Sequence, residues 1–381
     1  MEKTINISGR IDSNNSTDIE KKLLAEIADF DGDITLNAEK LEYISSAGLR
    51  VILKIKKMKN SLKIINCSPE IYEIFDMTGF TDIMSISKAF RNFSVEGCEV
   101  IGKGSNGTVY RIDPETIVKV YNSKNSLETI KRERELSQKA FIKGIPTAIP
   151  YDVVKVGDLY GSVFELLNAK SFAQLINEGE NLEELIKESV DLMKKFHSIE
   201  LKDNELPNKK EQQIEKARFC SKYLEESKAK KIINLIENIP DINNIIHGDF
   251  QVKNILKQNE EILIIDMDTL ASGHPIFEFG AFFATYEGYS CINKYNSSDF
   301  LGISYDNCQK IKDLTFEYYF NNKDKDYIDE IKNKAAIIGY IQILYSRLNK
   351  PKDYSKDNKD IIDFCIKYLN ENIDSIDELF F

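Results

Sequence analysis

Hydrophobic residues in the first ninety positions follow two alternating spacings. Ile19, Leu23 and Ile27 recur one helical turn apart, and Ser16 or Thr17 precedes them as the expected helix cap. Short apolar runs of the kind that form buried strands separate this helix from two others. Strands are predicted at 4–8, 34–36 and 62–66, and the further helices at 49–58 and 69–77. Strands separated by helices of this length indicate a small α/β layer domain.

The pattern changes after a stretch at about 88–96, where the periodicity fades. Short strands separated by turns then predict an antiparallel sheet with one charged helix. After Asn168 the chain is predicted to be mostly helical around one hairpin at 254–266. The strands are expected at 95–101, 109–112, 117–121, 151–156 and 160–165, and the charged helix at 126–140. We therefore expect three parts, at residues 1–88, 95–168 and 169–381.

Composition narrows the class of protein. The 381 residues are 42% hydrophobic and 30% charged, and the net charge of −11 comes without a long basic stripe, which argues against nucleic-acid binding. No apolar run reaches the ~20 residues that span a bilayer, and the N-terminus MEKTINISGR lacks the apolar core of a signal peptide. The six cysteines form no C-x-x-C pair. We expect reduced thiols, no membrane or nucleic-acid partner, and a cytoplasmic location.

Gly102, Gly104 and Gly107 form a G-x-G-x-x-G pattern. In a dinucleotide-binding fold the third glycine opens a helix, but here a β-type run at 109–112 follows it. The glycines are therefore expected in a hairpin turn whose backbone N–H groups can lie close over phosphates. A glycine-rich turn without a ligand is the alternative for this motif taken alone.

Lys119 lies in an apolar strand, where a buried ammonium would need a partner. The following helix offers Glu133 and Glu135. Glu133 shares a face with Leu136 and Ala140, so it points inward and is the predicted partner. A solvated Lys119 on an amphipathic strand is the alternative.

The strongest chemical signal is His-Gly-Asp-Phe-Gln-Val-Lys-Asn at 247–254, followed by Ile-Asp-Met-Asp at 265–268. Burying Asp249, Asn254 and Asp266 beside apolar strands is costly unless these groups bind something. Magnesium that bridges phosphate oxygens would satisfy them, because it prefers carboxylate and amide oxygens. Asp249 is then the base that takes the proton of an acceptor hydroxyl, and Asn254 and Asp266 hold the metal. Simple capping of turns is the alternative.

The pattern His-Gly-Asp-x-x-x-x-Asn followed by Ile-Asp-x-Asp resembles the aminoglycoside phosphotransferase and choline kinase group of kinase-like enzymes. The resemblance runs from about residue 95 to the C-terminus. It implies an α+β fold with an N-lobe at 95–168 and a helical C-lobe at 169–381, and the use of ATP and Mg²⁺. Protein kinases usually carry Arg and Lys where this chain has Gly248 and Gln251, which favours a small-molecule acceptor over a protein.

The same resemblance assigns further roles. Phe-Glu-Leu-Leu at 164–167 looks like the hinge, so the backbone of Glu165 and Leu167 is expected to bind adenine. The family often shows Gly-Asp-Pro and then Asp after the metal Asp; here His274 replaces the first of these acids and Glu278 the second. Glu278 is expected to brace the catalytic loop. From the chemistry of the hairpin itself, and not from the resemblance, His247 is expected to be a structural hydrogen-bonder rather than a base, and Asp268 to add an outer-shell contact.

Residues 41–53, Leu-Glu-Tyr-Ile-Ser-Ser-Ala-Gly-Leu-Arg-Val-Ile-Leu, resemble the signature of the STAS domains, the anti-sigma-factor antagonist fold. The match spans about residues 1–86 and implies a regulatory module that binds a protein partner. In regulatory members this turn reads Asp-Ser-Ser-Gly, and the serine before Gly is phosphorylated; here Ala47 has that place. Ser46 is the best remaining phosphosite, and a helix cap is its alternative role.

Together these features predict ATP- and Mg²⁺-dependent phosphorylation of a hydroxyl on a small molecule, with a STAS domain for regulation or partner binding. The alternative is a regulatory protein kinase or nucleotide-sensing module of an anti-sigma-type pathway. A catalytically dead scaffold is disfavoured, since a scaffold has no need of the buried polar set Lys119, Asp249, Asn254 and Asp266. No motif identifies the acceptor.

Overall fold

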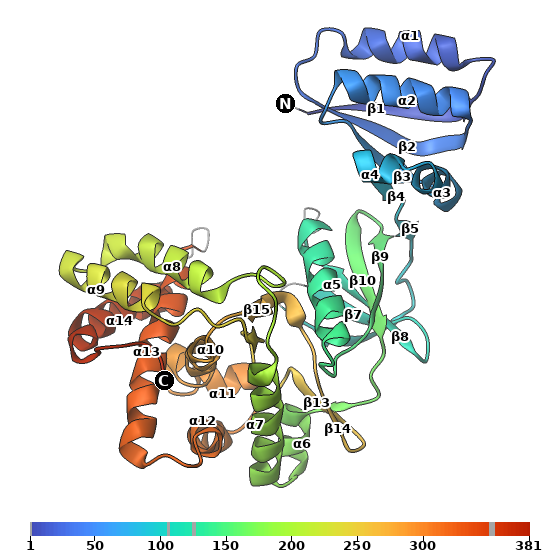
Figure 1. The fold of residues 1–381 in the computed structure, drawn as a ribbon. Coiled ribbons are helices and arrows are strands. Elements are labelled where there is room, and N and C mark those ends of the chain that lie inside the picture. The colour runs from blue at the N-terminus through green and yellow to red at the C-terminus, as the bar shows by residue number, and fades with distance from the viewer. Residues whose placement is uncertain (1, 105–106, 124–126, 350–354) are drawn as a thin grey trace. The chain divides into compact units, whose positions relative to one another are not determined.

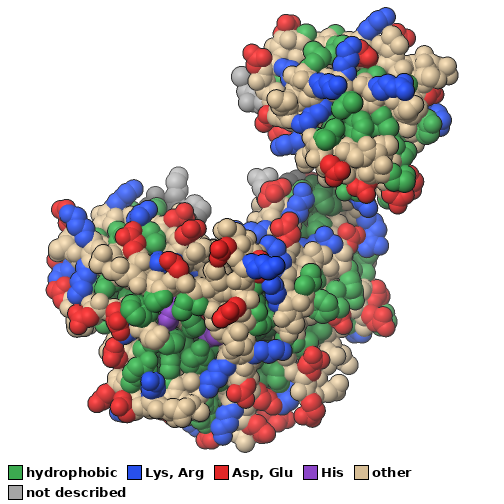
Figure 2. Space-filling view, in the orientation of Figure 1, with side chains coloured by type: hydrophobic (Ala, Val, Ile, Leu, Met, Phe, Trp, Pro, Cys, Tyr) green, Lys and Arg blue, Asp and Glu red, His purple; other side chains and the backbone are tan. Residues whose placement is uncertain are grey.

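A computed structural model describes residues 2–104, 107–123, 127–349 and 355–381 (Figure 1). The chain divides into two compact units. The first holds Met1–Ser94 with Val153–Asp158, and the second holds Val95–Asp152 with Leu159–Phe381. Lys and Arg are intermixed with Asp and Glu over the face shown in Figure 2, as expected for solvated surface charge. No helix in the described ranges is both long and apolar enough to cross a membrane.

The first unit is an α/β layer with a wholly parallel sheet in the order β1-β2-β3-β4. Its strands are β1 (Glu2–Ile11), β2 (Asp33–Ile44), β3 (Lys63–Cys67) and β4 (Ser85–Lys88). Its helices are α1 (Ser16–Ile27), α2 (Ser46–Met58), α3 (Pro69–Met77) and the short α4 (Phe80–Ile83). Buried side chains such as Ile34, Ile52 and Phe75 join the layers. The predicted α/β layer is confirmed.

Two local predictions in this unit were wrong. The residue before α1 is Asn15, so Ser16 and Thr17 lie inside the helix, and Asn15 makes no side-chain capping bond. The amide of Asn15 instead donates to the carbonyl of Arg10, at 2.7 Å. Strand β2 is also far longer than the predicted 34–36, because it continues through a polar stretch to Ile44.

The second unit begins with an antiparallel sheet in the order β10-β8-β7-β6. Its strands are β6 (Glu99–Lys103), β7 (Gly107–Arg111), β8 (Thr116–Tyr121) and β10 (Leu159–Glu165). Strand β9 (Pro150–Val156) continues this sheet, and the two-residue β5 (Arg91–Asn92) pairs parallel with β9. Helix α5 (Leu127–Ile142) precedes β9; Ser126, its predicted first residue, lies outside the described residues. Strand β6 starts at Glu99 rather than at 95, because Gly97 adopts a left-handed conformation (φ 79°) in a turn.

The remainder of the second unit is helical, as predicted (Figure 1). The helices are α6 (Phe172–Glu178), α7 (Leu182–Ser198), α8 (Lys209–Cys220), α9 (Glu226–Glu237), α10 (Ile276–Tyr286), α11 (Asn296–Leu301), α12 (Tyr305–Tyr319), α13 (Lys325–Leu348) and α14 (Lys356–Asn372). Helices α10 and α13 pack so closely that a Cβ on Gly280 would lie 2.4 Å from Ile338 Cγ2. This pair forms the centre of the helical core.

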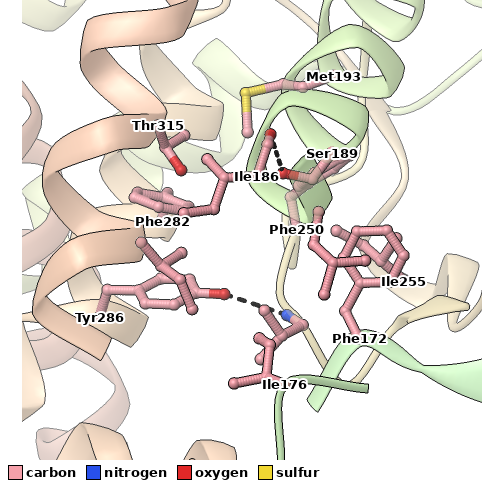
Figure 3. Close-up of a pocket in the computed structure, with 13 residues that line it drawn as sticks. Phe172, Ile176, Ile186, Ser189, Met193, Phe250, Ile255, Phe282, Tyr286 and Thr315 are labelled. Atoms are coloured by element: carbon pink, nitrogen blue, oxygen red, sulfur yellow. Dashed lines mark hydrogen bonds between the residues drawn. The ribbon is translucent and has the colours of Figure 1, made fainter. Parts of the chain in front are cut away.

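Short strands hold the segments that contain Asp249, Asn254 and Asp266 on this core. Strand β12 (Ile245–Ile246) pairs with β15 (Ala271–Ser272), and the hairpin of β13 (Ile255–Gln258) and β14 (Glu261–Ile264) pairs with β11 (Lys170–Ser171). A small cavity behind them is lined by apolar side chains that include Phe250, Ile255 and Phe282 (Figure 3). Its volume of about 10 Å³ holds at most one water molecule. It is a packing void rather than a ligand site.

Candidate active site

The three glycines lie in the hairpin between β6 and β7, as predicted. The N–H of Gly104 donates to the carbonyl of Gly107 at 2.9 Å, and Gly102 pairs with Val109 across the hairpin. A Cβ on Gly107 would lie only 2.4 Å from the carbonyl oxygen of Val120, so no larger residue fits there. Ser105 and Asn106, at the tip of the pattern, lie outside the described residues.

Lys119 on β8 joins two carboxylates from different elements. Its Nζ lies 2.8 Å from Glu133 Oε1 on α5 and 3.0 Å from Asp266 Oδ1. The hydroxyl of Tyr121 donates to the other oxygen of Glu133. Burial opposes the charged form of Lys119, but Asp266 and Glu133 outweigh it, so the pKa of Lys119 is raised above its ordinary value. The predicted Lys119–Glu133 contact is therefore present, with Asp266 as a third member.

The hinge segment leaves one backbone donor unused. The N–H of Glu165 donates to the carbonyl of Ile149 at 3.1 Å, and the N–H of Leu166 donates to Glu115 at 2.7 Å. The N–H of Leu167 makes no hydrogen bond with any residue that the structure describes. Because β10 ends at Glu165, this free donor lies just beyond the end of that strand. The arrangement is suited to a planar ring with acceptor nitrogens.

The side chain of Asp249 is held by two amides. Asn254 Nδ2 donates to Asp249 Oδ2 at 2.9 Å and to its backbone carbonyl at 3.0 Å. Gln251 Nε2 donates to both carboxylate oxygens, at 3.2 and 3.1 Å. The two side-chain amides therefore fix the direction in which the carboxylate of Asp249 points. The sequence had indicated Gln251 only as a departure from protein kinases.

The backbone of the same loop is braced from beneath by Glu278 on α10. The N–H groups of His247 and Gly248 donate to its two carboxylate oxygens, at 2.7 and 2.9 Å. Glu278 is fully buried, which raises its pKa, but the neighbouring His197 and His247 and the Gly248 N–H outweigh burial and lower it. The expected bracing role of the longer acid is confirmed.

Further contacts fix the loop. The N–H of Asp249 donates to His247 Nδ1 at 3.2 Å, so the Nε2–H of that ring is free to donate to the Ile265 carbonyl, also at 3.2 Å. Tyr286 accepts a hydrogen bond from the N–H of Val252 (3.1 Å), which Figure 3 shows at the wall of the small cavity. His247 is therefore the structural hydrogen-bonder that the sequence predicted.

Asp266 and Asn254 carry oxygen atoms of the kind that bind a cation. Asp266 adopts a left-handed conformation (φ 70°), as aspartate does more readily than most residues. The side-chain nitrogen of Asn254 donates to Asp249, and among the described residues no donor bonds to its Oδ1. In the described ranges no three His, Cys, Asp or Glu side chains cluster around a metal position. A carboxylate, an amide oxygen and phosphate oxygens nevertheless form a donor set that fits Mg²⁺.

Asp268 lies on the same turn, half-buried. Burial and the carboxylates of Asp266 and Glu133 raise its pKa to about 7. Asp268 therefore lies close to the ion pairs that Lys119 makes with Asp266 and Glu133.

The structure also identifies residues that the sequence did not single out for this site. Thr269 donates to the carbonyl of His247 at 2.7 Å, and Lys209 at the start of α8 brings its ammonium against Gly248. A lysine at the first position of a helix carries no sequence signal for such a contact. Tyr286 stood out only as one aromatic residue among many.

In the first unit, the serine turn lies between β2 and α2. Ser45 is the N-cap of α2, and its Oγ accepts from the N–H groups of Ala47 (3.2 Å) and Gly48 (3.4 Å). Ser46 is exposed and is the first residue of the helix. The alternative role of Ser46 as the cap was therefore wrong, and the cap is its neighbour.

Residues 97–290, just over half of the chain, match the model of the phosphotransferase enzyme family. The chain belongs to this family. This phosphotransferase is similar in fold to ADP-bound aminoglycoside phosphotransferase APH(2'')-Ib, at 15% identity and a TM-score of 0.51 over 81% of this chain and 99% of that one. A second similar structure is a thermostable mutant of APH(4)-Ia with AMP-PNP and hygromycin B, at 12% identity, a TM-score of 0.52, and coverage of 73% and 93%.

Residues 3–93 of the phosphotransferase match the model of the STAS domain. The anti-sigma-B factor antagonist of Bacillus subtilis is 33% identical over 87 residues, which are 22% of this chain and 79% of that protein. A protein named as an anti-sigma factor antagonist, BtrV of Bordetella bronchiseptica, is 29% identical over 87 residues, 22% of this chain and 75% of its own length. The enzyme thus joins a STAS domain to a kinase-like phosphotransferase domain.

Proposed function

We propose that this phosphotransferase moves the terminal phosphoryl group of ATP, with Mg²⁺, to a hydroxyl group of a small molecule. The observation that carries the proposal is the fixed carboxylate of Asp249, oriented by Gln251 and Asn254. In the reaction a bond forms between the acceptor oxygen and the γ-phosphorus, and the bond from that phosphorus to ADP breaks. The proton of the acceptor hydroxyl passes to Asp249.

The nucleotide would be held by groups on both lobes. Backbone N–H groups around Gly102, Gly104 and Gly107 would cover the phosphates, and Lys119, held by Glu133, would neutralise their charge. The carbonyl of Glu165 and the free N–H of Leu167 would pair with adenine. ADP and AMP-PNP in the two similar structures support an adenine nucleotide.

Asp266 and Asn254 would hold the magnesium ion, which supplies charge neutralisation on the phosphate oxygens when bound. Asp266 uses its Oδ1 in the ion pair with Lys119, so the Oδ2 of Asp266 would be available to the ion. Asn254 therefore acts twice, because its nitrogen orients Asp249 and its oxygen is available to the metal.

For the STAS domain we propose a protein partner and a regulatory role, as the names of its antagonist relatives suggest. Ala47 removes the hydroxyl from the position before Gly48. The Ser45 hydroxyl is engaged as a helix cap, whereas Ser46 is exposed. Ser46 is therefore the serine of this turn that a kinase could reach.

The test is ADP release by the full chain with ATP and Mg²⁺, measured against a panel of hydroxyl compounds. Asp249→Asn should lower the rate by at least about 100-fold, since general-base catalysis typically contributes 10²–10⁴-fold. Asp241→Asn is the matched control, because Asp241 is exposed and only pairs with Lys210 on the surface. Equal rates for wild type and D249N would refute the proposal. Phosphate appearing on an added protein instead of on any small compound would favour the alternative of a regulatory protein kinase.

A further inference from the structure

The ammonium of Lys209 reaches the catalytic loop from the start of α8. Its Nζ lies 2.9 Å from the position that a Cβ would occupy on Gly248, the residue directly before Asp249. Only 5% of Lys209 is exposed. Gly248 has a φ of 82°, and a side chain there would also meet the carbonyl of Thr269 at 2.9 Å. Lys209 thus fills the space beside Gly248 where protein kinases usually carry an arginine side chain.

Within the described part of the chain, Lys209 makes no hydrogen bond and no ion pair within 4 Å, and the carboxylates of Glu278, Asp249 and Asp268 act on it only from further away. Another buried lysine shows how this fold satisfies such a group. Lys334, 3% exposed, contacts Glu330 at 2.7 Å, Glu378 at 3.1 Å and the carbonyl of Phe380 at 2.8 Å. A buried ammonium without such partners is destabilising, so its retention beside a catalytic carboxylate needs another reason.

A second lysine lies on the same face of α8, two turns further along. Lys216 is half-buried, its Nζ lies 6.0 Å from the centroid of the Tyr345 ring, and it makes no ion pair with any residue that the structure describes. Burial and the nearby Lys209 lower the pKa of Lys216 to about 8. Burial also lowers the pKa of Lys209, and the carboxylates of Glu278, Asp249 and Asp268 offset only part of that effect. Carboxylates therefore act on Lys209 only from a distance, and neither lysine has one within 4 Å among the described residues.

We propose that the acceptor carries an anionic group, a carboxylate or a phosphate, which Lys209 binds beside Asp249 with Lys216 adding to the attraction. This assignment rests on the proposed phosphotransfer to a hydroxyl. An acid group at Lys209 would supply its missing partner and would place a neighbouring hydroxyl at Asp249. A polycationic acceptor would meet like charge at the same place, so the substrate class differs from the aminoglycosides of the structurally similar enzymes.

The first experiment uses the full chain saturated with AMP-PNP and Mg²⁺, so that the γ-phosphate position is filled. Inorganic phosphate is then titrated by calorimetry. Lys209→Met should weaken phosphate binding at least tenfold and Lys216→Met to a smaller extent. The unliganded K209M protein should unfold at the same or a higher temperature, because an unpaired buried charge has been removed. Lys334→Met, the control, should unfold at a lower temperature and keep the phosphate affinity.

Three results would overturn the assignment: no phosphate binding to wild type, equal binding to K209M, or a loss of AMP-PNP affinity in K209M in place of phosphate affinity. A loss of AMP-PNP affinity would mean that Lys209 binds the nucleotide rather than the acceptor. ADP release is then compared between hydroxy acids or sugar phosphates and neutral sugars or aminoglycosides, with the acidic class expected to be active. Transfer to a neutral or cationic acceptor would defeat only the anionic assignment. Absence of nucleotide binding, or full activity of D249N, would instead defeat the proposed function.

Discussion

Gln251 donates to both carboxylate oxygens of Asp249, and its own Oε1 is buried without a hydrogen-bond partner among the described residues. A buried unsatisfied carbonyl typically costs about 1–3 kcal/mol. The side-chain amide of Gln251 therefore points at Asp249 at a cost in stability. Such a trade is typical of catalytic sites.

Gln251→Leu should separate these two effects. The variant should be at least as stable as wild type, because the unsatisfied oxygen is gone, but kcat for ADP release should fall by about 10- to 100-fold as Asp249 loses its orientation. Steady-state kinetics and thermal unfolding measure both. Gln258→Leu on β13, which also removes a buried unsatisfied oxygen, serves as the control. A kcat for Q251L within twofold of wild type would contradict the orienting role.

Lys119→Met should destabilise the protein by about 3–5 kcal/mol, because it leaves the buried carboxylate of Glu133 without its cation. The double variant K119M/E133L should recover most of that stability and still fail to bind ATP. Urea unfolding and nucleotide titration distinguish the two properties. Lys131→Met, on an exposed face of α5, should change stability by less than about 0.5 kcal/mol. Recovery of ATP affinity in the double variant would show that Lys119 is only structural.

Ser45→Ala should lower the stability of the STAS domain by about 1 kcal/mol, since α2 loses its capping oxygen. Ser46→Ala should leave stability within about 0.5 kcal/mol of wild type, because that side chain is exposed and is not the cap. Denaturant unfolding of the full chain, followed by a probe placed in residues 1–94, provides the comparison. A larger loss in S46A than in S45A would reverse the assignment of the cap.

His274 should make the enzyme less stable in acid. Burial lowers its pKa from 6.5 to about 4, while its neutral ring accepts from the N–H of Ile276 and contacts the carbonyl of Phe381. The unfolded chain binds this proton between pH 6.5 and 4 and the folded chain does not. The free energy of unfolding therefore has its full value, as far as His274 is concerned, above pH 6.5. It falls by about 3 kcal/mol as the pH drops to 4.

His274→Gln should remove this part of the pH dependence, because the amide does not titrate. Urea midpoints measured from pH 7 to 4 should fall less steeply in H274Q than in wild type. Parallel curves for the two proteins would mean that other groups cause the acid sensitivity.

The sequence was most informative where the chemistry is local in the chain. The spacing of Glu133 with Leu136 and Ala140 predicted which acid faces Lys119, and the His-Gly-Asp motif predicted that Asp249 and Asn254 lie together. These predictions depend on helical periodicity and on a short loop. Both are set by residues within a few positions of one another.

What the sequence could not supply depends on contacts between distant segments. Lys209 lies about forty residues before Gly248, and only the packing of α8 against the catalytic loop brings them together. The predictions of the helix caps were wrong for a different reason. Neighbouring polar residues such as Asn15 and Ser16, or Ser45 and Ser46, have nearly equal preferences, and the backbone conformation chooses between them.

The bracing of the loop by Glu278 has a consequence for how the enzyme matures. The N–H groups of His247 and Gly248 donate to Glu278, which lies on a helix thirty residues later in the chain. During synthesis these groups are hydrogen-bonded to water until α10 has left the ribosome and packed. The loop therefore lacks these two hydrogen bonds until α10 has been made and has packed. A chain truncated before α10 would leave the N–H groups of His247 and Gly248 without the carboxylate that accepts from them.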